Sequence, residues 1–75
     1  MFSMTIRPEV LKELREKYTE GTRVRLVRML DPYREMPEGL EGTVQFVDDA
    51  GSIHVSWDNG SSLAALYGID RIEVI

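Results

Sequence analysis

The chain has 75 residues, no cysteine and a formal net charge of −4. A chain of this length forms one small domain, with room for one core and a surface site but not for a deep catalytic cavity. The missing cysteines exclude a disulfide framework and a thiolate metal site. The sequence has neither a signal-peptide pattern nor a run of about 18 apolar residues. We therefore expect a soluble cytoplasmic protein without membrane association.

Charge is distributed unevenly along the chain. Residues 23–34 contain four arginines and one acid, Asp31, whereas residues 35–75 contain eight acids and one arginine, Arg71. The acidic balance argues against a dedicated duplex-DNA binder, because such proteins neutralise phosphates with lysine and arginine. The sequence predicts one basic strand in an otherwise acidic domain.

An amphipathic helix is predicted over about residues 8–18. Val10, Leu11, Leu14 and Tyr18 form one apolar stripe at helical spacing. Pro8 suits the first helical position, where its missing N–H costs nothing. A helix this short is marginal alone, so we expect the stripe to pack on the rest of the domain.

Five short segments have strand patterns, over about residues 22–29, 42–48, 52–57, 61–66 and 71–75. Residues 30–39 contain Pro32 and Pro37 and predict a long loop. Residues 67–70 are too few for a strand and predict a single helical turn. The pattern indicates a mainly β fold: a small five-stranded SH3-like barrel over residues 22–75, preceded by a helical extension over residues 1–21.

The first tight turn predicted between strands is Asn59-Gly60. This dipeptide favours a two-residue type I′ hairpin. With the pair central, Trp57 lies opposite Ser62 and Ile53 lies opposite Leu66.

The second turn, around Gly51, allows two registers. The favoured register pairs Phe46 with Val55 and places Phe46 in the core with Val44. A three-residue loop with Gly51 in a bulge would instead pair Phe46 with His54.

Several motifs resemble those of a bacterial and phage-borne family, catalogued as domain of unknown function 4314. The resemblance covers roughly residues 21–75 and implies an SH3-like barrel, but no known activity. The motifs that carry it are Glu20-Gly21-Thr22-Arg23-Val24-Arg25-Leu26, Asp31-Pro32-Tyr33, Gly39-Leu40-Glu41-Gly42-Thr43-Val44, Asp48-Asp49-Ala50-Gly51 and Val55-Ser56-Trp57-Asp58-Asn59-Gly60-Ser61.

A looser likeness is to the KOW-type barrels of ribosomal and transcription-elongation proteins. It rests on the spacing of Gly21, Val24 and Leu26, and later on Gly39, Gly42 and Val44. The intervening insert is longer than that motif expects, and Glu38 and Glu41 lie where an RNA-facing loop would carry cations.

Aromatic and apolar residues in and near the long loop are candidates for a shallow peptide-binding groove. The candidates are Pro32, Tyr33, Met36, Trp57 and Tyr67. Trp57 has a second interpretation, because the only tryptophan of so small a domain is commonly part of the core. In that case it closes the barrel end beneath the helix.

Arginines on and after the first strand are candidates for an anion-binding stripe. They are Arg23, Arg25, Arg28 and Arg34. The alternative is that they pair with nearby acids or are simply solvated.

The remaining polar residues predict no catalysis and no cofactor. The single histidine, His54, cannot assemble a metal site or a catalytic triad without further partners. Asp48, Asp49 and Asp58 suit turns, where such side chains bond their own backbone.

We therefore expect a non-enzymatic module that binds a protein or peptide through the 30–39 loop, as a monomer or weak homodimer. One alternative is a nucleic-acid-associated barrel that uses the arginine stripe. The other follows from the family resemblance: a small acidic phage or mobile-element inhibitor.

Overall fold

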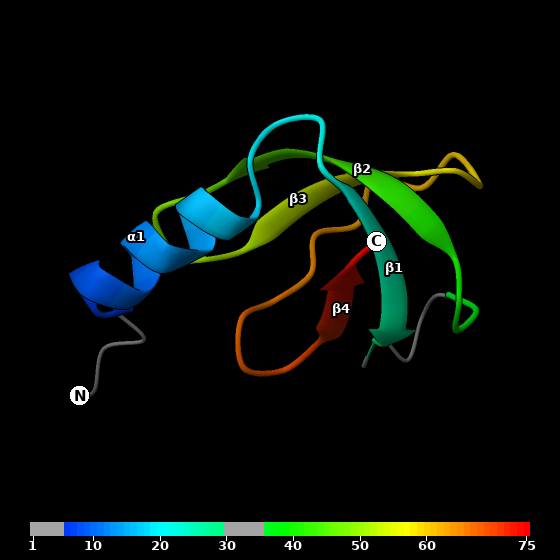
Figure 1. The fold of residues 1–75 in the computed structure, drawn as a ribbon. Helices are drawn as coiled ribbons and strands as arrows, with labels where there is room; N and C mark the ends of the chain where they lie inside the picture. The colour runs from blue at the N-terminus through cyan, green and yellow to red at the C-terminus, as the bar shows by residue number, and fades with distance from the viewer. Residues whose placement is uncertain (1–5, 30–35) are drawn as a thin grey trace.

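The computed structural model describes residues 6–29 and 36–75. Within them, the chain forms one helix and four strands (Figure 1). The elements are α1 (Pro8–Lys17), β1 (Arg23–Arg28), β2 (Glu41–Val47), β3 (Ile53–Trp57) and β4 (Arg71–Val74). Of the predicted groove and stripe residues, Pro32, Tyr33 and Arg34 lie outside the described residues, as does most of the predicted 30–39 loop.

The four strands form one antiparallel sheet in the order β3-β2-β1-β4. The mainly β class is confirmed, but the sheet is open and the predicted fifth strand at residues 61–66 is absent from it. That segment follows β3 only loosely, through a single bridge between Ile53 and Ala65 and a hydrogen bond from Trp57 N to Ser61 O. The alternation in the sequence identified a segment that lies beside β3 without forming a regular ladder.

The sheet curls so that its two edges approach one another. Ala65 lies beside β3 at one edge, and Arg71 begins β4 at the other edge only six residues later. A flat sheet would separate these positions by four strand spacings of about 4.8 Å each. The connecting segment is too contracted for that distance, because the amide of Asp70 donates to the carbonyl of Leu66 at 2.9 Å. Register shifts after Leu26 in β1 and after Val44 in β2 supply bends of the kind that increase twist.

The register predicted as favoured for the β2–β3 hairpin is wrong. Phe46 pairs with His54 rather than with Val55, so the alternative with a three-residue loop is the one observed. Gly51 has φ +85°, and Asp48 N donates to Ser52 O at 3.0 Å. Phe46 is consequently 54% exposed instead of buried.

The bulge at Gln45 explains why the core survives this change of register. Val44 pairs with Val55 and Val47 pairs with Ile53, with one extra residue of β2 accommodated between them. Val44 and Val47 are therefore both buried, although they are three residues apart and regular alternation would place them on opposite faces.

The turn after β3 is likewise not the predicted type I′ turn. Gly60 has φ +89°, but no described residue other than glycine has a positive φ, so Asn59 does not adopt the conformation that type I′ requires. Trp57 O accepts from Gly60 N, and Trp57 N donates to Ser61 O. The longer turn shifts the pairing by one residue, so Ile53 lies opposite Ala65 rather than Leu66.

Helix α1 packs beside the tip of the β2–β3 hairpin (Figure 1). It begins at Pro8, as predicted, and ends one residue before Tyr18, whose amide donates to Leu14 O at 2.8 Å. Leu11 and Leu14 are partly buried against the core, and Tyr18 is buried in it. Arg15 fixes the contact by donating to Val47 O and, at 2.8 Å, to Asp49 Oδ1.

The described residues form a hydrophobic core between the curled sheet and α1. Its buried members are Tyr18, Val24, Leu26, Val44, Val47, Ile53, Val55, Trp57 and Ala65. The single described helix is too short and too polar to span a membrane.

Candidate functional site

Trp57 belongs to the core rather than to an exposed groove. Its side chain is 2% exposed, and the indole Nε1 donates to Leu63 O at 2.8 Å. This bond holds the irregular 61–66 segment against β3. Of the other described groove candidates, Met36 is half-buried against the core and Tyr67 is exposed.

Arg23 is occupied by an ion-pair network on the outer face of β1 and β2. Its guanidinium donates to both carboxylate oxygens of Asp58, at 2.9 and 2.6 Å, and to Glu41 at 3.4 Å. The hydrogen bond to Asp58 is the main cause that raises the pKa of Arg23, and the same bond lowers the pKa of Asp58. Arg23 is therefore neutralised within the chain, as the alternative interpretation of the stripe expects.

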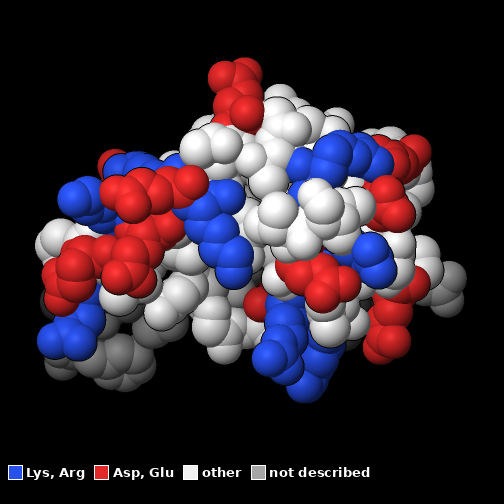
Figure 2. All heavy atoms as spheres, viewed as in Figure 1, with Lys and Arg blue, Asp and Glu red and all other residues white. Residues whose placement is uncertain are grey.

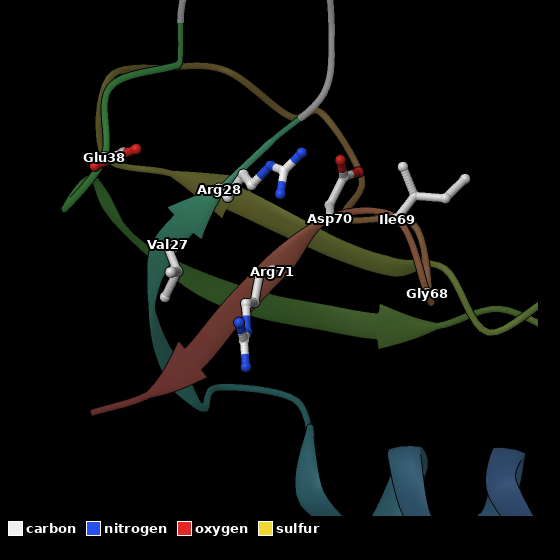
Figure 3. Close-up of a pocket in the computed structure, with 7 residues that line it drawn as sticks. All are labelled: Val27, Arg28, Glu38, Gly68, Ile69, Asp70 and Arg71. Atoms are coloured by element: carbon white, nitrogen blue, oxygen red, sulfur yellow. The ribbon is translucent and has the colours of Figure 1, made fainter.

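The other described arginines of the stripe also lie near acidic side chains of the same chain. Arg25 lies 3.7 Å from Glu73, its neighbour on β4. Arg28 follows the bulge in β1 and pairs with Arg71, and Figure 3 shows its side chain extending toward Asp70. Because of the bulge, Arg28 lies on the same face of the sheet as Arg25, although the two are three residues apart.

The 66–70 turn brings exposed apolar side chains together. Leu66 O accepts from the amides of Ile69 and Asp70, and the Asp70 carboxylate accepts from Leu66 N at 2.8 Å. Gly68, with φ +79°, allows the chain to reverse. Leu66, Tyr67 and Ile69 are 43%, 51% and 47% exposed. The turn is therefore closed internally by backbone bonds and displays its large side chains to solvent.

A hollow lies on each side of this turn. The helix-side hollow, of about 210 Å³, lies between α1, the turn and β4, and its lining is mostly apolar: Leu14, Tyr18, Ile53, Ala65, Leu66, Tyr67, Gly68, Asp70, Arg71 and Ile72. The loop-side hollow, of about 480 Å³, is more polar and contains Val27, Arg28, Glu38, Gly68, Ile69, Asp70 and Arg71 (Figure 3). Arg28, from the predicted arginine stripe, and Glu38, from the predicted 30–39 loop, thus line the same hollow as the turn. Of the turn, only Tyr67 was predicted as a contact residue.

A second exposed aromatic residue lies on β2. The Phe46 ring stacks on His54 with centroids 4.2 Å apart, and His54 Nε2 donates to Asp48 Oδ2 at 2.9 Å. This bond is the main cause that lowers the pKa of Asp48, whose other oxygen accepts from Ala50 and Ser52 amides. Sequence reasoning placed Phe46 in the core and missed this stack, because the register depended on the bulge.

Charged residues of both signs are interspersed over the face seen in Figure 2. Within residues 6–29 and 36–75, no three histidine, aspartate or glutamate side chains gather into a group that would hold a metal ion. The clearest feature that remains is apolar: the 66–70 turn with its helix-side hollow.

A family model described as "Domain of unknown function (DUF4314)" matches residues 7–75. The chain belongs to this family. The match includes α1, whereas the motifs in the sequence indicated a resemblance from about residue 21. No curated protein and no solved structure matches the chain. The function of this DUF4314 domain is therefore inferred from the geometry of its surface.

Proposed function

We propose that this protein is a non-enzymatic protein-binding module, and that its contact surface is the 66–70 turn together with the helix-side hollow. The observation that carries the proposal is the exposure of Leu66, Tyr67 and Ile69 on one internally bonded turn. Tyrosine and large apolar side chains give contact area at low entropic cost and are common centres of binding energy.

The chemistry of the hollow indicates what the partner presents. Leu14, Tyr18 and Leu66 give it an apolar lining, so it suits an apolar side chain of the partner protein. The turn itself needs little rearrangement on binding, because its backbone bonds are already formed.

Affinity capture with matched variants tests the proposal. The tagged protein is compared with Tyr67→Ser and with Phe46→Ser, since both aromatic side chains are about half exposed but lie on different surfaces. We expect Tyr67→Ser to reduce recovery of the captured protein at least about tenfold, as for an interface hot spot. Phe46→Ser should leave recovery unchanged. Equal recovery by the wild type and Tyr67→Ser would contradict the proposed surface.

Nucleic-acid binding, the alternative from the sequence, has less support from the geometry. Arg23 and Arg25 are paired with acids of the same domain, which reduces the positive charge available to neutralise phosphates. We expect no change in fluorescence anisotropy of labelled single- or double-stranded DNA or RNA at low salt. Binding that is lost in Arg23→Gln and Arg25→Gln would favour the alternative instead.

The third hypothesis, an acidic inhibitor, would require a surface where carboxylates dominate. The face in Figure 2 mixes both signs. Asp49 and Asp58 already pair with arginines of the same chain. The apolar turn therefore remains the better supported contact surface.

A further inference from the structure

The outer side of β4 is an open edge of the sheet. Ile75 N donates to Arg23 O at 3.1 Å, and hydrogen-bonding directions alternate along an antiparallel strand. Glu73 and Ile75 therefore face β1, whereas the backbone groups of Ile72 and Val74 face away from it. Among the described residues, no strand or loop pairs with that side of β4. Such an edge is a template for another strand.

The side chains of β4 carry opposite charges on one face. Arg71 and Glu73 alternate with Ile72 and Val74, so the two charged residues lie on the same side of the sheet. Glu73 lies 3.7 Å from Arg25, and Arg71 makes no ion pair with any described residue. Val74 and Ile75 are also exposed, at 44% and 47%.

We propose that two copies of this chain associate by antiparallel pairing of their β4 edges, with Ile72 opposite Ile72 of the second copy. Directly opposed residues lie on the same face of an antiparallel pair. Arg71 of each copy then lies opposite Glu73 of the other, which gives two ion pairs related by the two-fold axis. The outward-facing backbone groups of Ile72 bond one another.

The alternative registers are less favourable. Only registers that pair outward-facing residues of both copies form the ladder, so the centre of the pairing moves in steps of one residue along β4. Centring it on Arg71 opposes two arginines, and centring it on Glu73 opposes two glutamates. Centring it on Val74 shortens the paired segment and forms no ion pair. Charge complementarity thus selects both the partner and the register.

The association is expected to be weak and reversible. Pairing one short strand buries less than the roughly 800 Å² per partner of a standard stable interface. We therefore expect dimers at concentrations on the order of 100 μM or above, rather than an obligate assembly.

Charge reversal tests the inference by sedimentation equilibrium of the full chain at low salt. Arg71→Glu and Glu73→Arg each place like charges opposite one another twice, and should weaken dimerisation about tenfold or more. The double variant R71E/E73R reverses both charges and should restore the dissociation constant to within about threefold of the wild type.

Arg25→Gln is the matched control, because it removes the intrachain neighbour of Glu73 without altering the intermolecular pairs. It should leave dimerisation unchanged or strengthen it. Phe46→Ser, on β2 and two strands away from the β4 edge, should also dimerise normally. A wild type that stays monomeric to about 1 mM, or a double variant as weak as the single variants, would overturn the inference.

Discussion

At the scale of single residues, Gly42 lies where β2 and β3 leave no space for a side chain. A Cβ added there would lie 2.6 Å from Val55 Cγ1 and 2.9 Å from both Ser56 O and Trp57 Cε3. Because one of these atoms belongs to the backbone and two to packed core residues, Gly42→Ala should destabilise the protein by about 1–3 kcal/mol. Urea unfolding followed by fluorescence of Trp57, the only tryptophan, measures this change directly.

Gln45→Ala is the control for that substitution, since Gln45 lies in the same strand but is exposed at the bulge. Its free energy of unfolding should stay within about 0.5 kcal/mol of the wild type. If Gly42→Ala is equally harmless, Val55 and Trp57 do not pack closely over Gly42 as the structure has them.

The core role of Trp57 was one of two interpretations that the sequence allowed, and burial confirms it. Tyr67 was named from the sequence as a contact residue, whereas Leu66 was expected to point inward from a strand. The sequence held a signal for this exposed turn, because residues 67–70 are too few for a strand. Large apolar side chains in a turn have no regular face on which to be buried.

At the scale of elements, the 48–52 turn depends on the charge of Asp48. Its pKa is lowered chiefly by the hydrogen bond from His54, with further bonds from Ser52 and Ala50. A carboxyl whose pKa is lowered on folding contributes stability above its unfolded pKa, and that contribution is lost as the pH falls through the folded pKa.

Asp48→Asn should therefore lower the free energy of unfolding at pH 7, and its effect should shrink as the pH falls below about 4 toward the lowered pKa of the folded state, where the wild-type carboxyl also becomes neutral. Asparagine retains an oxygen for the Ala50 and Ser52 amides, so the substitution keeps the backbone bonds of the turn while it removes the charge and the acceptor for His54. Urea unfolding of both proteins at pH 7 and pH 3 gives the comparison. An equal difference at the two pH values would show that ionisation of Asp48 is not the cause.

Helix α1 makes a second prediction at this scale. Leu14 packs against the core and lines the helix-side hollow, whereas the neighbouring Glu13 is exposed. Leu14→Ala should cost about 1–3 kcal/mol, less than at a fully buried site, and Glu13→Ala less than about 0.5 kcal/mol. Thermal unfolding with a circular dichroism readout compares the two. Equal losses would mean that α1 does not contribute through its apolar stripe.

The elements themselves were largely predictable, because alternation and helical spacing are local signals. The helix and four of the five predicted strands are present with similar bounds. Registers were not predictable, since a bulge at Gln45 and a longer turn at Gly60 each move the pairing by one residue. Those choices depend on how Val47 and Trp57 pack across the whole sheet.

At the scale of the whole molecule, the open sheet predicts an alternating pattern of hydrogen exchange in β4. The amides of Glu73 and Ile75 face β1, whereas those of Ile72 and Val74 face the free edge. In dilute solution, where chains are monomeric, Glu73 and Ile75 should exchange at least about tenfold more slowly than Ile72 and Val74. Amide-resolved exchange by NMR measures all four. If Ile72 and Val74 exchange as slowly as Glu73 and Ile75 in dilute solution, the edge is covered and the sheet is closed, which would also remove the basis for edge pairing. If instead the amides of Ile72 and Val74 become more protected as the protein concentration rises, and this protection is lost in Arg71→Glu, the second copy lies at this edge.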